Sequence, residues 1–149
     1  MNGATDSLKV RPASRSDAKW VARLLEGLGY ACDQGLVAER LARLERDPSA
    51  DVLVAVNANR VVGAVVLYFV PVLHEPGPWC RMTALAVNEH ERGRGVGRAL
   101  VAAAEVAART AGCGRIEATS ANERRDAHRF YESLGYRRRS SHFLKLLGE

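Results

Sequence analysis

The stretch from Ala84 to Leu100, A-L-A-V-N-E-H-E-R-G-R-G-V-G-R-A-L, constrains the fold of this chain more than any other. It begins with apolar residues typical of a buried strand and passes through a polar turn to three alternating glycines, Gly93, Gly95 and Gly97. An alanine-rich pattern with helical spacing follows. The order of strand, glycine loop and helix predicts an α/β unit whose loop is suited to holding phosphate groups.

The predicted loop has the chemistry of an anion site. Glycines permit tight turns and close approach of a ligand, and the first amides of a helix have no partner within the helix. Those amides lie at the positive end of the helix dipole, and Arg92, Arg94 and Arg98 add full positive charges. The spacing does not fit two common phosphate loops, because no Lys-Ser/Thr pair follows the glycines and G-x-G-x-x-G is absent.

The pattern that fits is R-x-x-G-x-G, formed by Arg92, Gly95 and Gly97. Downstream come Asn122 and then A-H-R-F-Y-E-S-L-G-Y, from Ala127 to Tyr136. These two motifs, in this order and at this separation, resemble those of the GNAT superfamily of acetyl-coenzyme A-dependent N-acetyltransferases. Two ordered motifs are more specific than either one alone.

Length and composition favour a single globular domain. A chain of 149 residues can bury a sizeable core, and 47% hydrophobic with 26% charged residues is ordinary for such a domain. The net charge of +5 favours anionic partners. Arginines gather at 92–98 and 124–139, with little of the aromatic interleaving that stacks bases. A phosphorylated cofactor explains the first cluster better than the second, and a solvated basic surface is at least as good an interpretation as nucleic-acid binding.

Cysteine usage and apolar runs predict a cytoplasmic protein without metal. Cys32, Cys80 and Cys113 are odd in number and lack the paired spacing of a zinc site or a disulfide framework. A reducing compartment is therefore expected. No cluster of His, Cys, Asp and Glu has metal-ligand spacing. The first residues lack the core of a signal peptide, and the run from Val61 to Val70 is too short to span a bilayer, so no membrane partner is expected.

Periodicity and turn residues predict the order of elements. Strands are expected at 8–11, 51–56, 61–70, 79–87 and 115–119, with further strand material at Tyr136 and 142–147. Helices are expected from Ser14 or Ser16 to about 29, from 33 to about 46, from 95 to 111, and from a capping box at Ser120 and Glu123 to about 134. The segment 71–78 is expected to be a loop. This order predicts a three-layer α/β domain with a mixed central sheet flanked by helices. It also resembles the GNAT fold, which implies one N-acetyltransferase domain over residues 1–149.

The GNAT resemblance implies where acetyl-coenzyme A binds. In that family the strand before the glycine loop splays from its neighbour and its backbone binds the pantetheine arm. That role falls here to Leu85, Ala86 and Val87. The pyrophosphate loop comprises Arg92, Gly93, Arg94, Gly95, Val96 and Gly97, with Arg98 beside it. Asn122 would contact the amide region of the cofactor, since an amide both donates and accepts, although a helix-start role is an equal alternative.

By the same resemblance, Tyr131 is the general acid. When an amine attacks a thioester, charge develops on the carbonyl oxygen, and the departing thiolate benefits from a proton donor. A phenol with a pKa of about 10 stays protonated at neutral pH. The alternative is that Phe130, Tyr131 and Leu134 only form the apolar face of a helix.

The general base is where this chain departs from the family pattern. Many relatives have a glutamate two residues before the position of Leu85, where this chain has Thr83. Threonine does not remove a proton at neutral pH, so a water chain or another side chain must do so. His74 and Glu75 are the nearest candidates in sequence for a base or a water relay.

These features predict an N-acetyltransferase that moves an acetyl group to a primary amine by direct attack in a ternary complex. The acceptor is expected near Tyr30, Asp33 and Trp79, in segments that the cofactor motifs leave unexplained. A small amine, an amino-acid derivative or an aminoglycoside-like compound is the first expectation, and a protein N-terminus or lysine the second. A non-catalytic acyl-coenzyme A sensor and a basic nucleic-acid-binding protein are the alternatives from other classes. The family also implies a possible homodimer through the carboxy-terminal strands.

Overall fold

The computed structural model describes residues 8–119, 125–139 and 142–148. The described residues before 120 form one compact unit, and those after it form a second, smaller unit. Within the described chain, the first unit contains the strands and the helices that cover them, and the second contains one helix.

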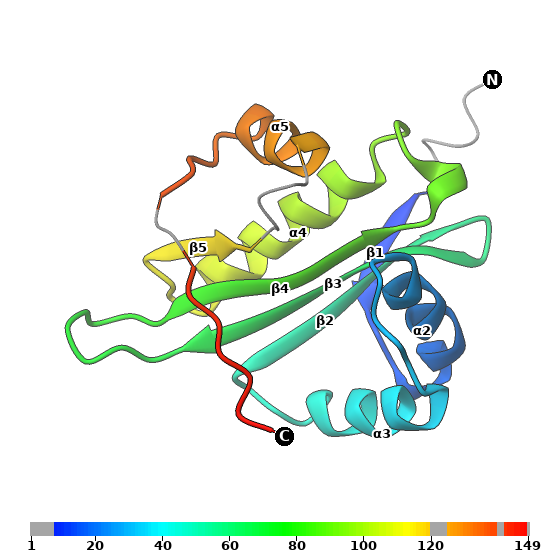
Figure 1. Cartoon of the computed structure of the whole chain (residues 1–149), viewed down its shortest axis with the longest axis horizontal. Helices are drawn as coiled ribbons and strands as arrows, with labels where there is room; N and C mark the ends of the chain where they lie inside the picture. Colours follow the sequence, from blue (N-terminus) through cyan, green and yellow to red (C-terminus); the bar gives the residue numbers. More distant parts are fainter. Residues whose placement is uncertain (1–7, 120–124, 140–141, 149) are drawn as a thin grey trace. The chain divides into compact units, whose positions relative to one another are not determined.

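The first unit is built on a mixed sheet of five strands (Figure 1). In spatial order these are β1 (Lys9–Pro12), β2 (Ala50–Asn57), β3 (Arg60–Val70), β4 (Trp79–Val87) and β5 (Arg115–Ala118). The first four pair antiparallel, and β5 runs parallel to β4. The five predicted strands are confirmed to within one residue at each end, and 71–78 is the predicted loop.

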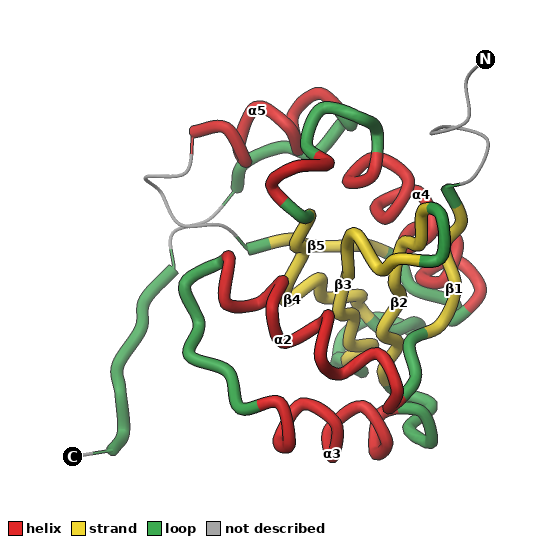
Figure 2. Tube along the Cα trace, turned by 90° about the vertical axis from the view of Figure 1, so that its right-hand side faces the viewer, coloured by secondary structure: helices red, strands yellow, loops and turns green. Residues whose placement is uncertain are grey.

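Helices cover both faces of the sheet. Helices α2 (Ala18–Gly27) and α3 (Gln34–Leu44) lie on one face, and α4 (Val96–Thr110) lies on the other (Figure 2). Short 3-10 turns, η1 (Arg15–Asp17) and η2 (Glu89–Glu91), precede α2 and the glycine loop. The three layers confirm the predicted fold class. None of the described helices is both long and apolar enough to cross a bilayer.

Apolar side chains fill the space between the layers. On one face, Val21 and Leu24 of α2 and Leu41 of α3 pack with Val54 of β2 and Ala64 of β3. On the other face, α4 buries the stripe Val96, Leu100, Val101, Ala104 and Ala108. The periodicity that predicted these helices therefore marks the faces that they bury.

Gly63 sets how closely α4 approaches the sheet. A Cβ built on Gly63 would lie 2.9 Å from both Leu100 Cδ1 and Val96 Cγ1, and 3.2 Å from the carbonyl oxygen of Ala86. A larger residue on β3 would therefore push the first turns of α4 outward. The glycine places the amino end of α4 against the sheet, directly after the glycine loop.

The second unit contains α5 (Arg125–Ser133). Gly135 follows the helix with φ +92°, and its N–H donates to the carbonyl of Glu132 at 3.1 Å, as expected for a glycine that ends a helix. The predicted end near Leu134 is confirmed. The predicted capping box, Ser120 and Glu123, lies outside the described residues.

The prediction of strand at Tyr136 and at 142–147 is wrong for the described residues, which contain no strand after β5. Phe143 and Leu147 are 95% and 92% exposed. A strand needs a neighbour that accepts its backbone hydrogen bonds and covers its side chains, and apolar composition does not supply one. A dimer formed through such strands stays a prediction.

Candidate active site

Strand β4 loses its parallel neighbour half-way along its length. β5 pairs with β4 only from Trp79 to Met82, and Met82 lies opposite Ala118, the last residue of β5. The register of β3 against β4 shifts at the same place, because Val66 faces Ala84 whereas Leu67 faces Met82. Thr83 is the extra residue of this β-bulge, and it is exposed. Among the described residues, β4 therefore has no strand partner on this edge beyond Met82.

Leu85, Ala86 and Val87 lie in the open half of β4. They pair with β3, opposite Val65, Ala64 and Gly63. In the described chain, β5 reaches none of the three. One edge of this half-strand can therefore hydrogen-bond an extended ligand while its side chains stay packed. Their contact with a pantetheine arm stays a prediction.

The glycine loop follows the open half of β4. Asn88 Oδ1 accepts a hydrogen bond from the N–H of His90 at 2.9 Å and so shapes η2. Gly93 and Gly95 then take φ values of +79° and +84°, and a Cβ at either position would meet nothing within 4 Å. These positions therefore need glycine for backbone conformation, not for space.

Gly95 is the N-cap of α4, and its carbonyl accepts the first helical hydrogen bond, from the N–H of Ala99. The amides of Val96, Gly97 and Arg98 therefore lie in the first turn without partners inside the helix. Arg92, Arg94 and Arg98 are all exposed around them. This arrangement, called the phosphate cradle below, fits the diphosphate of a nucleotide cofactor.

His74 and Glu75 lie at the other end of β4. Glu75 Oε1 accepts a hydrogen bond from Trp79 Nε1 at 3.0 Å, and Glu75 Oε2 lies 3.9 Å from both His74 Nε2 and Arg115 Nη2. The Arg115 guanidinium covers the Trp79 ring at 3.9 Å. Figure 1 shows the 71–78 loop at the left end of the sheet and the glycine loop at its right end. The two ends of β4 are eight steps of about 3.3 Å apart, roughly 26 Å.

The structure therefore does not bring His74, Glu75 or Trp79 together with the phosphate cradle. Arg81 and Glu117, which the sequence did not single out, lie closer to the bulge. Arg81 Nε lies 3.5 Å from Glu117 Oε1, and the two residues are register partners on β4 and β5. Arg81 and Thr83 are both exposed, whereas Met82 between them is buried.

The other expected acceptor residues, Tyr30 and Asp33, lie at the joint between α2 and α3. Asp33 is the N-cap of α3, and its Oδ1 accepts the N–H of Gly35 at 2.8 Å. Tyr30 is exposed in the connection between α2 and α3. Figure 1 shows that connection on the side of the sheet where α2 lies, away from the 71–78 loop. Tyr30 and Asp33 are thus separated from Trp79 in the fold.

Tyr131 lies in α5, in the second unit. Its ring packs against Phe130 and Tyr136, with centroid distances of 5.2 and 5.6 Å. Burial raises the pKa of the Tyr131 phenol above its ordinary value. The phenol therefore keeps its proton throughout the neutral range, as a general acid requires. Asn122 lies outside the described residues.

A cysteine nucleophile is not supported by the environment of Cys80. Burial, with smaller contributions from Cys113 and Asp51, raises the pKa of the Cys80 thiol to about 12. A thiol in that state carries no thiolate at neutral pH. Among the residues that the structure describes, no three His, Cys, Asp or Glu side chains are grouped to hold a metal ion.

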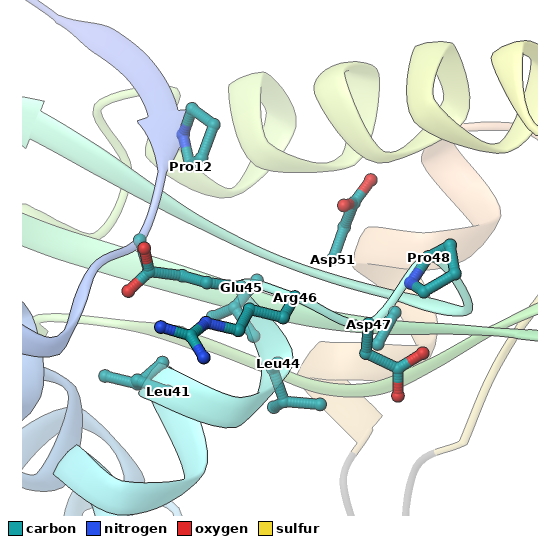
Figure 3. A pocket seen from close by; sticks show the side chains of 11 residues that line it. Pro12, Leu41, Leu44, Glu45, Arg46, Asp47, Pro48 and Asp51 are labelled. Carbon is teal, nitrogen blue, oxygen red and sulfur yellow. The ribbon is translucent and has the colours of Figure 1, made fainter.

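A cleft of about 620 Å³ lies away from the cradle, where the ends of β1 and α3 meet the start of β2 (Figure 3). Two of its carboxylates, Glu45 and Asp47, accept local hydrogen bonds. Glu45 accepts the N–H of Arg15 at 3.2 Å. Hydrogen bonds from Ser49 lower the pKa of Asp47. The contacts of Ser49 with Asp47 shape the turn between α3 and β2.

Comparison with known proteins decides the family. Residues 19–136 match the model of the acetyltransferase (GNAT) family. The chain belongs to this family. GNAT acetyltransferases use acetyl-coenzyme A as the cosubstrate, and the predicted class of enzyme, an N-acetyltransferase, is confirmed.

The proteins similar to this GNAT chain have different names, and two of them name an acceptor. It is 36% identical over 140 residues to an aminoalkylphosphonate N-acetyltransferase of Salmonella typhimurium, covering 93% of this chain and 91% of the relative. A transcriptional regulator from Bacillus halodurans has a similar structure, with a TM-score of 0.82, 26% identity and coverage of 93% and 98% of the two chains. An aminoglycoside acetyltransferase from an uncultured soil metagenomic sample has a TM-score of 0.81, 22% identity and coverage of 96% and 98%. These structures confirm the GNAT fold.

Proposed function

We propose that this GNAT enzyme acetylates the primary amine of a small anionic acceptor, with an aminoalkylphosphonate as the leading candidate. The observation that carries the proposal is the 36% identity, over nearly the whole of both chains, to the aminoalkylphosphonate N-acetyltransferase. Charge supports it. The chain carries +5, which attracts an anionic phosphonate and repels a polycationic aminoglycoside.

Arg81 is the proposed contact for the anionic group. It lies two residues before Thr83, the bulge residue, and both side chains are exposed. Its ion pair with Glu117 uses Nε. The two Nη groups of a guanidinium form the fork of donors that binds the oxygens of a phosphonate. This places a cation about two residues along the strand, roughly 7 Å, from the bulge.

The chain's own residues divide the work of the reaction. Acetyl-coenzyme A supplies an acyl thioester that an amine can attack directly. The phosphate cradle holds the diphosphate, and the backbone of Leu85, Ala86 and Val87 aligns the arm along β4. Tyr131 donates a proton to the leaving thiolate. Because Thr83 is not a base, water carries the proton away from the attacking amine.

Turnover with matched acceptors tests the proposal. Thiol release from acetyl-coenzyme A is measured with 2-aminoethylphosphonate, with ethylamine and with sisomicin. We expect kcat/KM for the phosphonate to exceed that for ethylamine about 100-fold, close to the discrimination of a charge-assisted contact, and Arg81→Gln to remove most of the difference. Equal rates with ethylamine, or a preference for sisomicin or a peptide amine, would overturn the proposed acceptor.

Tyr131→Phe separates an enzyme from a sensor. Loss of a general acid lowers kcat by about 100-fold or more. Binding of acetyl-coenzyme A should be retained, with a stabilisation of about 2.7 kcal/mol at one hundred times the dissociation constant, seen as a shift of several degrees in Tm. A wild-type protein that binds the cosubstrate and acetylates no amine would be a sensor. Absence of any shift, with salt-sensitive binding of DNA or RNA instead, would favour a nucleic-acid binder.

A further inference from the structure

Glu91 is a buried carboxylate at the foot of the phosphate cradle. It ends η2 directly before Arg92 and is 7% exposed. Its Oε1 atom is buried and has no hydrogen-bond partner among the described residues. A buried charge without hydrogen bonds is unfavourable unless nearby cations offset it.

Two arginines from different parts of the chain provide that offset. Arg60 Nη2 lies 3.9 Å from Glu91 Oε2, and Arg94 Nη1 lies 3.8 Å from Glu91 Oε1. The side chains of Arg60 and Arg94 are 72% and 59% exposed. Each guanidinium therefore faces the carboxylate on one side and keeps most of its donors toward solvent.

The backbone fixes Arg60 at this place. Arg60 is the first residue of β3, directly after a two-residue turn in which Ala58 and Asn59 have φ values of +51° and +65°. The N–H of Asn88 donates to the carbonyl of Val62 at 2.8 Å and ties the loop to the same strand. A positive φ at an alanine is strained, and such strain persists where the surrounding structure holds it in place.

We propose that Arg60 is a further phosphate-binding residue of the cradle and that Glu91 is the positioning residue that holds Arg60 and Arg94 in place. The inference rests on the proposed binding of acetyl-coenzyme A at the glycine loop. Arg60, Arg92, Arg94 and Arg98 outnumber the carboxylates of Glu89 and Glu91, so positive charge is left over for an anion. Glu91 fixes the direction of two of these cations without neutralising the group.

The ligand chemistry is a phosphate group, and coenzyme A offers two kinds, the diphosphate and the 3′-phosphate. Dissociation constants for coenzyme A and for 3′-dephospho-coenzyme A separate them. If Arg60→Gln weakens both ligands about tenfold, Arg60 binds the diphosphate. If it weakens coenzyme A alone, Arg60 binds the 3′-phosphate. Either result supports the proposal, and Arg43→Gln, an exposed arginine of α3, is the matched control.

Glu91→Gln provides the sharper test, because two models predict opposite signs. If Glu91 were only a negative charge near the phosphates, its removal would tighten coenzyme A binding. If it positions Arg60 and Arg94, Glu91→Gln weakens binding several-fold and raises the KM for acetyl-coenzyme A, while kcat and the KM for the amine stay within twofold. In the double variant with Arg60→Gln, the two losses should be less than additive.

The failures are distinguishable. If wild type does not bind coenzyme A, the proposed function fails. If wild type binds, and Arg60→Gln binds both ligands as tightly as Arg43→Gln does, or Glu91→Gln binds more tightly than wild type, this inference alone is overturned. The Tm of each variant confirms that folded proteins are compared. If Glu91→Gln weakens coenzyme A binding, Glu91→Asp, which keeps the charge, should bind more tightly than Glu91→Gln.

Discussion

Two glutamates, Glu75 and Glu91, stand near the two ends of β4 and do different things with their charge. Glu75 accepts a hydrogen bond from Trp79 and faces His74 and Arg115. Glu91 is more deeply buried and lies near Arg60 and Arg94 at 3.8–3.9 Å, with Oε1 accepting no hydrogen bond in the described chain. The first arrangement joins a loop to a sheet, and the second orients cations.

The difference shows that charged groups can stabilise the fold at one place and bind a ligand at another. At the amino end of β4, the Glu75 carboxylate accepts a hydrogen bond from the indole of Trp79, and the Arg115 guanidinium stacks on the same ring. These contacts stabilise the fold. At the carboxyl end, arginines outnumber carboxylates around a loop whose following amides have no partner within α4. We therefore expect substitutions at the two ends to separate stability from cosubstrate affinity.

The largest expected effect is on affinity, from Gly95→Glu. The new side chain brings bulk and negative charge into the cradle, and coenzyme A should bind at least about 100-fold more weakly, a loss of about 2.7 kcal/mol. Gly112→Glu is the matched control, since Gly112 follows the other end of α4 with φ +80° and equally open space. Both variants should lose about 1–2 kcal/mol of stability from the left-handed backbone. Equal affinity in the two, measured by calorimetry, would remove the glycine loop from the binding site.

The next effect is on stability, from Asp17→Asn. Asp17 is buried like Glu91, but both of its carboxylate oxygens accept hydrogen bonds. Arg11 donates to the two oxygens at 2.9 and 3.0 Å, and the N–H of Ser14 donates at 2.8 Å. These hydrogen bonds, that from Arg11 foremost, hold the pKa of Asp17 below its ordinary value. We expect Asp17→Asn to lower the free energy of unfolding by about 2 kcal/mol at pH 7.

The same carboxylate has a pH signature. Because its folded-state pKa is below the unfolded value, the unfolded state binds more protons between the two values, and stability falls as the pH falls through that window. The contribution is complete above the unfolded pKa of about 3.9 and disappears below the folded one. Denaturant titrations from pH 6 to pH 2 should show a shallower decline for Asp17→Asn than for wild type. Parallel curves would contradict the role of Asp17.

A smaller effect is expected from Glu75→Ala. Loss of the acceptor for Trp79 Nε1 should cost about 1 kcal/mol of stability, with coenzyme A affinity unchanged. The same variant tests Glu75 as a base. Since Glu75 lies beyond the amino end of β4, kcat should change less than threefold, whereas removing a general base would lower it by orders of magnitude. A large fall in kcat together with a shifted pH profile would show that Glu75 acts as the general base.

The smallest effect is expected from Ala58→Gly. Glycine relieves the positive φ that alanine adopts in the turn before Arg60, offset in part by the entropy of the unfolded chain, and should stabilise the protein by about 0.5 kcal/mol. Ala58→Val should act in the opposite direction. Chemical denaturation measures both, and stabilisation by valine would show that the turn is not strained.

Local sequence predicted much of this molecule because its strands and helices bury faces with regular periodicity. The run of Val61 to Val70 and the stripe from Val96 to Ala108 specify their own elements. Tyr131 could be singled out because a linear motif surrounds it. The glycine loop was readable for the same reason, since the residues that shape it are consecutive.

The features that the sequence did not predict depend on pairing between residues that are distant along the chain. The bulge at Thr83 is a mismatch of register with β3, and no pattern within β4 marks it. Arg60 reaches Glu91 because a turn and a strand register bring together residues 31 positions apart. The apolar segment at 142–147 has strand composition, yet composition does not provide the neighbour that a strand needs.

Gly63 has a consequence for the thermodynamics of binding. By letting Val96 and Leu100 rest on β3, it anchors the first turn of α4 to the most buried part of the sheet. The amides of that turn are therefore fixed in direction before any phosphate group arrives. A site ordered in advance loses little conformational entropy when a ligand binds. The free energy of its hydrogen bonds to phosphate therefore contributes almost fully to the affinity.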